Sequence, residues 1–243
     1  MRLKIFTFLF SLFSATCSFA EQTDQGMDIL NVRQQAIISI SAFTANGDIV
    51  KLKSELNAGL ESDLSVNEIK EILIQLYAYC GFPRSLNGIN AFIDVIKERE
   101  AQGIKDNIGK EATPLPKDMD KDAYGAKVRR ELAGWDKEPP AQGYQLFTPV
   151  MDVYLKEHLF ADIFARDVLN HQERELVTIA ALAAMSGTQG QLQFHFGAAI
   201  NSGFTLSQMY AFVKVLNIKI GQKEAKIADK VLSDVLKSRG NKT

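Results

Sequence analysis

The sequence predicts an all-α protein made of two similar helical units in tandem. Apolar residues recur at helical spacing through most of the chain, and no segment shows the alternation typical of a strand. The two halves also align without gaps at an offset of 140 residues, 33–81 against 173–221. In this alignment the helix breaks at Gly47 and Gly187 coincide. Helix breaks and apolar residues that fall at the same aligned positions indicate an internal duplication.

The first residues, Met1 to Ala20, are typical of a secretory signal. Arg2 and Lys4 give a basic start, and an apolar run from Ile5 to Phe13 follows before small residues at the cleavage position. The run is too short for a membrane span. We expect cleavage after Ala20, a periplasmic or secreted mature protein, and no membrane association after removal of the signal.

Composition excludes several classes of protein. The chain has 28 basic and 29 acidic residues and no long basic run, which argues against nucleic acid or an anionic membrane as partner. Loss of Cys17 with the signal leaves Cys80 alone, so the mature chain cannot form an intrachain disulfide. The three histidines show no recognised metal-ligand spacing, so no metal is expected.

The first unit, residues 27–102, contains four predicted helices. They cover residues 29–45, 49–60, 66–80 and 83–102. Ser65 and Glu68 have the spacing of a capping box before the third helix. Gly81 ends that helix, and Pro83 suits the first position of the next.

Residues 103–146 form a predicted irregular connector, since they contain two pairs of closely spaced prolines and several glycines. We expect one short helix in it, around residues 126–132. The second unit, residues 147–240, contains the remaining predicted helices. They cover residues 149–169, a pair from 173 to 204 broken at Ser186-Gly187, and then 206–220 and 224–237.

Glu175 and His195 form the main candidate site. Asn170 and Glu173 make a capping box. Glu175, in the first turn of the same helix, is therefore not needed as a cap. His195 lies on the apolar face of the next helix. A carboxylate and a histidine can handle a proton together. The alternative is structural: a glutamate that interacts with the helix dipole and a buried core histidine.

Short motifs in both units carry a family resemblance. They are Arg174-Glu175-Leu176, Gln191 to His195 and Gly203-Phe204-Thr205 in the second unit, and Tyr77 to Pro83 with Asn87 in the first. This combination resembles the carboxymuconolactone decarboxylase family, which includes the alkylhydroperoxidase D-like (AhpD-like) proteins. The resemblance implies an all-α, AhpD-like fold and a homo-oligomer, commonly a trimer or hexamer.

The resemblance also implies a chemistry. The peroxidase branch of the family uses a Cys-x-x-Cys pair, and this chain has Thr188 and Gln191 in its place. The decarboxylase branch, which is a lyase, needs no cysteine pair, metal or organic cofactor. We therefore expect cofactor-free acid–base chemistry by Glu175 and His195 on a small carboxylated or carbonyl compound.

Residues near the end of the third helix supply the candidates for substrate binding. Arg84 stands at a helix start, where the dipole disfavours a cation, so a bound carboxylate could compensate it. The alternative is a solvent-exposed arginine with no binding role. Together with Tyr79 and Asn87, Arg84 predicts a small anionic substrate. Cys80 supports the alternative function, a thiol-dependent peroxidase with peroxiredoxin-type activity, although a buried structural cysteine fits the same position. A non-enzymatic binding role is the third hypothesis.

His158, Asp162 and Arg166 recur at intervals of four residues on one predicted helix. This spacing predicts a surface ladder of hydrogen bonds and ion pairs. A metal site is the weaker interpretation of the same residues.

Overall fold

The structure, a computed structural model, describes residue 26 and residues 29–240, and its regular elements over that range are all helical. They are α2 (Val32–Asn46), α3 (Ile49–Glu61), α4 (Val66–Ala101), α5 (Lys121–Ala133), α6 (Tyr144–Phe147), α7 (Pro149–Val153), the π-helix η1 (Tyr154–Ile163), α8 (His171–Ala183), α9 (Gln189–Asn201), α10 (Leu206–Val215), the π-helix η2 (Leu216–Ile220) and α11 (Gln222–Gly240). The predicted all-α fold is confirmed. The predicted signal, residues 1–20, lies outside the described residues.

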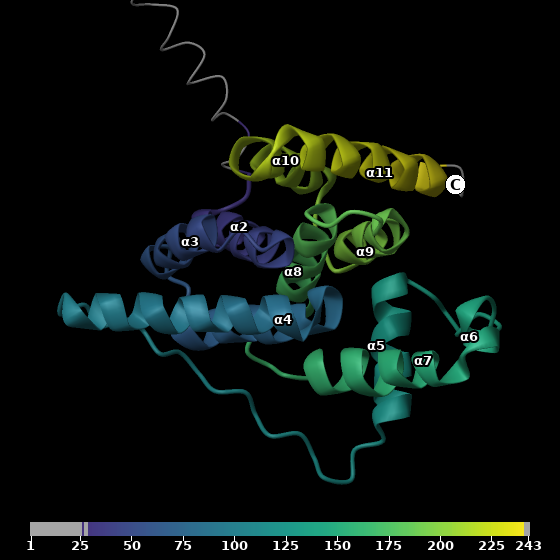
Figure 1. Cartoon of the computed structure of the whole chain (residues 1–243). Helices are drawn as coiled ribbons and strands as arrows, with labels where there is room; N and C mark the ends of the chain where they lie inside the picture. The colour runs from purple at the N-terminus through teal and green to yellow at the C-terminus, as the bar shows by residue number, and fades with distance from the viewer. Residues whose placement is uncertain (1–25, 27–28, 241–243) are drawn as a thin grey trace, which may run out of the picture.

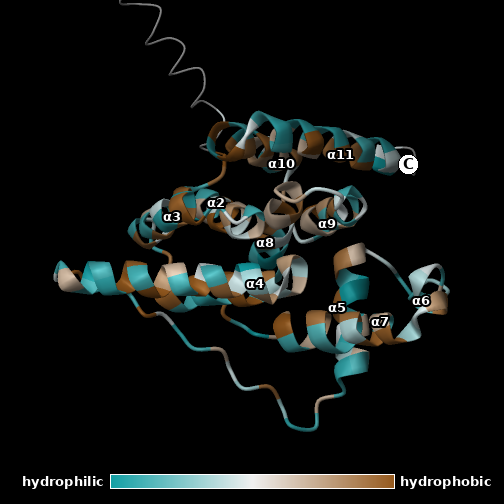
Figure 2. Cartoon of the chain, viewed as in Figure 1, coloured by the Kyte–Doolittle hydropathy of each residue, from teal (hydrophilic) through white to brown (hydrophobic). Residues whose placement is uncertain are grey.

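Helices α2 and α8 form the centre of the molecule. The run from Ala36 to Ala45 is buried without interruption in α2, and so is the run from Arg174 to Ala183 in α8. A helix that is buried all round lies in a core. The two helices pack against each other, with α3 and α9 beside them, α4 on one side and α10 with α11 on the other (Figure 1). Figure 2 shows hydrophilic residues on the outward faces of α4 and α11.

Reciprocal contacts relate the two units by an approximate two-fold axis, because Tyr79 packs against His195 and the aligned residues Lys219 and Glu55 also contact each other. Helices α3 and α9 both have 13 residues, and Gly47 and Gly187, which precede them, have the same φ of +83°. Arg33 and Glu173, an aligned pair of positions, form an ion pair of 2.6 Å across the axis. Each unit therefore covers the other, because the two central helices meet at this axis.

The helix starts are fixed by side-chain caps. Capping boxes are present at four helix starts, which include the two predicted at Ser65 and Asn170. They are formed by Ser65 with Glu68, Asn170 with Glu173, Thr205 with Gln208, and Asn31 with Gln34. The predicted starts of the third helix and of the helices at residues 171 and 206 are thereby confirmed.

Gly81 interrupts α4. Its φ of 81° and ψ of 159° are not helical, and this region of the backbone is accessible almost only to glycine. The interruption confirms the predicted stop at Gly81 and restart at Pro83. As a result Tyr79 and Cys80 lie at the end of a helical segment, beside the second unit.

The region between the units is more ordered than predicted. Helix α5 covers residues 121–133 rather than 126–132, and the short α6 was not predicted. The predicted helix 149–169 is replaced by α7 and η1, which ends at Ile163. Packing explains the difference, because α5 and η1 share a second apolar core. Its buried members are Val128, Leu132, Leu159, Phe160, Ile163, Phe164 and Ala198.

The extended part of the connector is also held in place by hydrogen bonds. The backbone N–H groups of Val66 and Asn67, at the start of α4, each donate to a connector carbonyl at 2.9 Å. The acceptors belong to Asn107 and Ile108. The connector therefore satisfies donors that the first turn of a helix leaves free. Over the described residues, no helix is both long and apolar enough to cross a membrane.

Gly125 allows α5 to approach η1, and we predict that Gly125→Ala destabilises the protein. An added Cβ would overlap the backbone carbonyl of Lys156. Overpacking of this kind costs about 1–3 kcal/mol. The measurement is the urea midpoint of unfolding. Gly190→Ala is the control, because a Cβ there meets open space and alanine favours a helix by about 0.5–1 kcal/mol. Equal midpoints for the two variants would contradict the close packing of α5 and η1.

Candidate functional site

Glu175 and His195 meet in the interior of the second unit. Helix α8 carries the glutamate in its first turn and α9 carries the histidine at mid-length, and the two helices pack together. Glu175 Oε2 lies 2.8 Å from His195 Nδ1. The glutamate is fully buried and the histidine is 5% exposed. The structure thus brings together the pair that the sequence singled out, while its catalytic role stays a prediction.

The hydrogen bond assigns the tautomer of His195. A carboxylate oxygen accepts, so Nδ1 carries the hydrogen and Nε2 keeps its lone pair. Nε2 has no protein partner in the described part of the chain and is not sealed from solvent. The arrangement leaves a free, oriented basic nitrogen at the edge of the core.

Aromatic side chains surround the imidazole. The rings of Tyr79 and Phe194 lie edge-on to it, with centroid separations of 5.6 Å and 5.1 Å. Trp135 packs against Phe194 at 6.3 Å. Apolar walls of this kind exclude water and strengthen the electrostatic interactions inside them. Phe194 belongs to the motif Gln191 to His195, whereas Trp135 stands in no sequence pattern that distinguishes a site from a core.

Two buried polar atoms at this site have no hydrogen-bond partner among the described residues. They are the hydroxyl of Tyr79 and Oε1 of Glu175. Burial, and next the carboxylate of Glu175, raise the pKa of the Tyr79 phenol, so the hydroxyl keeps its proton. One atom is therefore a donor and the other an acceptor. Buried polar groups are nearly always paired in folded proteins. Seven buried side-chain atoms of the described residues lack a partner, and Nε of Arg174, the residue before Glu175, is another of them.

Arg174 holds the start of α8 against α4. It is fully buried, and its guanidinium donates to Gln75 Oε1 at 3.0 Å, to the Arg166 carbonyl at 2.6 Å and to Glu71 at 3.3 Å. Gln75 also donates to the Arg174 carbonyl and to Thr178. Burial lowers the pKa of Arg174, and Glu71 opposes that effect. A sequence signal existed, because Arg174 is a cation in a first helical turn, as Arg84 is.

Arg84 and Asn87, the predicted binding residues, are exposed on the second segment of α4. Neither has a hydrogen-bond or ion-pair partner within the described range. Ser85 is buried and donates to the Leu73 carbonyl, so it does not contribute to a carboxylate pocket beside Arg84. Of the predicted binding residues, Tyr79 alone contacts the Glu175–His195 pair directly.

Cys80 is half-buried, and its Sγ donates to the Leu76 carbonyl at 3.1 Å. Burial raises the pKa of the thiol to about 11, although the charge of Arg84 acts in the opposite direction. At neutral pH the thiolate, which is the nucleophilic form, is therefore scarce.

The predicted ladder on residues 158–166 forms only in part. His158 Nδ1 lies 3.0 Å from Asp162, but Arg166 turns away and pairs with Glu71 on α4 at 2.6 Å. The reason is that η1 ends at Ile163, so Arg166 no longer continues the helical row. Over the described residues no group of three or more metal-ligating side chains is arranged to hold an ion.

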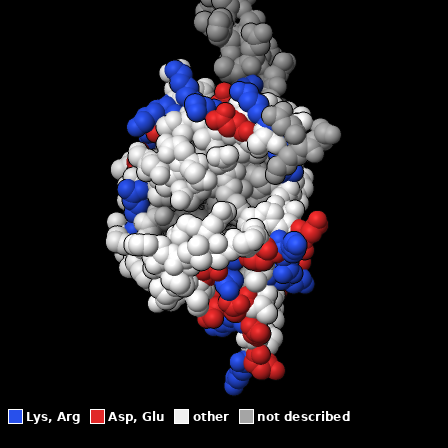
Figure 3. Space-filling view, turned by 90° about the vertical axis from the view of Figure 1, so that its right-hand side faces the viewer, with Lys and Arg blue, Asp and Glu red and all other residues white. Residues whose placement is uncertain are grey.

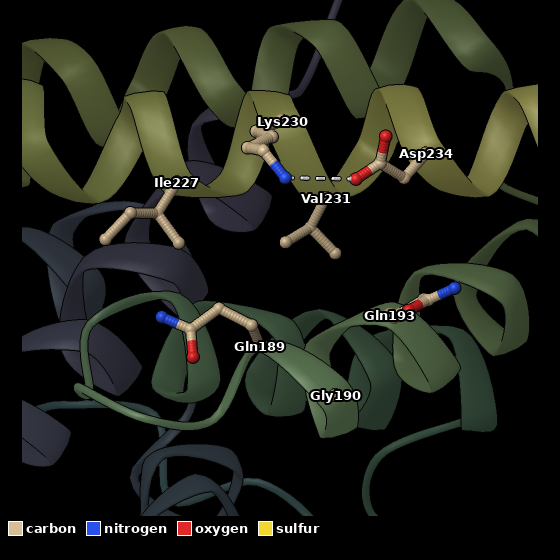
Figure 4. A pocket seen from close by; sticks show the side chains of 7 residues that line it. All are labelled: Gln189, Gly190, Gln193, Ile227, Lys230, Val231 and Asp234. Atoms are coloured by element: carbon tan, nitrogen blue, oxygen red, sulfur yellow. Dashed lines mark hydrogen bonds and ion pairs between the residues drawn. The ribbon is translucent and has the colours of Figure 1, made fainter.

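A hollow of the described structure lies away from this site. It has a volume of about 340 Å³ between α9 and α11, and Figure 4 shows Gln189 and Gln193 facing Lys230 and Val231 across it. These α9 residues point to the side of the helix opposite His195, as helical spacing requires. A second hollow of about 130 Å³ lies beside Glu71 and Arg166. Neither hollow includes Glu175 or His195.

The comparison with protein families agrees with the geometry. Residues 151–225 match the carboxymuconolactone decarboxylase family, and this segment contains both Glu175 and His195. The resemblance expected from the sequence is thereby confirmed over this segment. No curated protein matches the chain.

His171 opens α8 next to the site, and we predict that it titrates below its ordinary pKa of 6.5. Burial, and next the charge of Arg174, lower its pKa. The neutral form is favoured in the folded state, so this contribution to stability is present above pH 6.5 and lost as the pH falls below it. The measurement is the proton NMR titration of the histidine rings. A midpoint for His171 at or above 6.5 would contradict its burial against Arg174.

Proposed function

From the match of residues 151–225 to the carboxymuconolactone decarboxylase family, we propose that this chain is a cofactor-free enzyme that transfers protons on a small carbonyl or carboxylated compound. His195 is the general base, and Glu175 fixes its tautomer. The observation that carries the proposal is the buried contact of 2.8 Å between Glu175 Oε2 and His195 Nδ1. It leaves Nε2 with a lone pair directed away from the carboxylate.

The chemistry requires only these two side chains and the substrate. Nε2 takes a proton from a carbon beside a carbonyl, and the electron pair of the broken C–H bond moves onto the carbonyl oxygen. The carboxylate of Glu175 stabilises the imidazolium that forms, which then returns the proton to the substrate or product. Histidine suits this cycle because its charge changes near neutral pH.

Arg84 is the proposed binding residue for a carboxylate on the substrate. It is exposed and lacks an ion-pair partner within the described range, so its charge is available at the surface. It is also close enough to Cys80 to influence that thiol, and Cys80 follows Tyr79 directly. An anionic group held there would lie outside the buried pair rather than against it.

The alternative function is a thiol-dependent peroxidase that uses Cys80. The proximity of Arg84 favours a thiolate, but burial has the larger effect and raises the pKa of the thiol to about 11. The acid–base function therefore has the stronger support.

We further propose that the chain is exported and self-associates. The basic and apolar N-terminal residues support export. Self-association is supported by the α6–α7 surface, which we define by its large exposed apolar side chains. They are Tyr144, Leu146, Phe147, Val150, Met151, Val153 and Tyr154. Figure 3 shows that the face of the molecule carrying α6 is largely free of charge, with charged residues at its rim. Apolar surface of this extent is typical of an interface.

We predict that His195→Gln removes most of the activity. Loss of a general acid–base group costs about a hundredfold to ten-thousandfold in rate. The measurement is proton NMR in deuterated water with a carboxylated lactone, a 3-oxo acid and a 1,3-diketone, following loss of the carbon-bound proton or of carbon dioxide. Glu175→Gln should lower the rate as well, because the tautomer is no longer fixed by a carboxylate.

Cys80→Ala is the control in the same assays and in a peroxide-consumption assay with dithiothreitol. It should leave proton transfer unchanged. Near-normal turnover by His195→Gln on a substrate that the wild type converts would disprove the assignment. Peroxide consumption that disappears in Cys80→Ala, with no proton transfer by the wild type, would favour the peroxidase.

We predict that Phe147→Glu weakens self-association. Phe147 is 92% exposed on the α6–α7 surface, and a charge there would have to be desolvated in an interface. The measurement is light scattering coupled to size-exclusion chromatography, in which the wild type should be a trimer or hexamer. Val50→Glu is the control, since Val50 is 83% exposed but lies on α3. A monomeric wild type at micromolar concentration would contradict the assembly.

A further inference from the structure

We propose that Tyr79 donates a hydrogen bond to the reacting oxygen of the substrate, and that the group which enters the Glu175–His195 site is a neutral carbonyl. The inference rests on the proposed proton-transfer function and names its substrate class. It assigns the first unit a direct part in the chemistry of the second, because Tyr79 lies on α4 while the acid and the base lie on α8 and α9.

The two unpartnered atoms define what the site can bind. The Tyr79 hydroxyl can donate and Oε1 of Glu175 can accept, and both are buried. Tyr79 packs edge-on against His195, whose Nδ1 is bonded to the other oxygen of Glu175. A ligand oxygen that accepts from the tyrosine would therefore lie beside the Glu175–His195 pair. Folded proteins rarely leave buried polar atoms unpaired, so the missing partners point to a ligand.

The tyrosine is suited to stabilise a developing negative charge. Its hydroxyl does not meet the geometry of a hydrogen bond with any described side chain, although Thr178 is nearby. Burial raises the pKa of the phenol, so it remains a donor throughout the physiological range. A fixed donor aimed at an oxygen that gains charge stabilises the transition state more than the ground state.

The charges around the site favour a neutral group. Two carboxyl groups, those of Glu71 and Glu175, are matched by two guanidinium groups, those of Arg166 and Arg174. Arg166 donates to Glu71, and Arg174 donates to Glu71, to the Gln75 side chain and to the Arg166 carbonyl. The buried Nε of Arg174 has no partner among the described residues. No cation of the described structure is left free inside to neutralise an anion, which would be costly to bury. Any carboxylate of the substrate must stay outside, where Arg84 is exposed.

The proposed step is balanced without an external reagent. The proton on the carbon beside the carbonyl moves to Nε2 of His195, and its electron pair becomes the second bond to the neighbouring carbon. The carbonyl π pair moves to the oxygen, which is held by the Tyr79 hydroxyl as an enolate. Reversal at the same or another carbon returns the proton. The aromatic rings of Tyr79 and Phe194 provide walls for such a planar intermediate.

The equivalent position of the first unit cannot act in the same way. Lys219 and Glu55 occupy the places that correspond to Tyr79 and His195 under the approximate two-fold axis. Their side chains form an ion pair, with Lys219 Nζ 3.0 Å from Glu55 Oε2. Each chain should therefore bind one ligand of this kind.

The test uses 4-fluorophenol, whose hydroxyl-bearing planar ring resembles a neutral enol. Fluorine NMR titration of the full chain should show saturable binding at one site per chain. Tyr79→Phe should weaken the binding about tenfold, as expected for one lost hydrogen bond to a ligand. Tyr77→Phe is the matched control: it removes the same atom from the same helix, where Tyr77 stacks on Phe82 and not on His195, and it should change the affinity less than twofold.

Thermal unfolding of the same variants separates a functional role from a structural one. Because the Tyr79 hydroxyl has no partner, Tyr79→Phe should not lower the melting temperature while it weakens binding. His195→Gln should abolish proton exchange yet retain phenol binding, so failure of the base and failure of the tyrosine are distinguishable. Absence of saturable binding by the wild type, equal binding by Tyr79→Phe, or destabilisation by that variant would each overturn the inference.

Discussion

The buried guanidinium of Arg174 is the interaction on which the candidate site depends. It lies between α8 and α4 and is held by Gln75, Glu71 and the carbonyl of Arg166. The next residue in the chain is Glu175, so the same contacts that anchor the first turn of α8 also orient the acid. A buried ion pair that loses one partner costs about 3–5 kcal/mol, because the other charge stays buried without compensation. The position of the site is therefore coupled to the stability of the interface between the two units.

The two units have diverged into different uses of one arrangement. Across the approximate two-fold axis, Tyr79 meets His195 on one side and Lys219 meets Glu55 on the other. The first contact leaves a polar hydroxyl unsatisfied inside the protein, whereas the second is a closed ion pair. In a tandem chain these two contacts can change independently, because aligned positions of the two units need not hold the same residue. One side is then free to stabilise the fold while the other retains unpaired groups.

The surroundings of the site separate its polar and apolar parts. Aromatic rings line the imidazole, while the charged network of Glu71, Arg166 and Arg174 lies on the α4 side of the acid. In this network both guanidinium groups pair with the single carboxylate of Glu71. This arrangement suits a base that must take a proton from carbon, because water and competing charges are kept away from it.

The sequence by itself determined most of the helices with their caps and breaks, and the family resemblance indicated the pairing of Glu175 with His195. These features depend on local periodicity, on capping residues three apart, and on glycine at Gly81, all of which act within a few residues. Tertiary structure decided the rest. It turned residues 154–163 into a π-helix, extended α5, directed Arg166 to Glu71, and left the Tyr79 hydroxyl unpaired. Those outcomes depend on which distant side chains arrive beside each residue, and the spacing of residues along one chain does not contain that information.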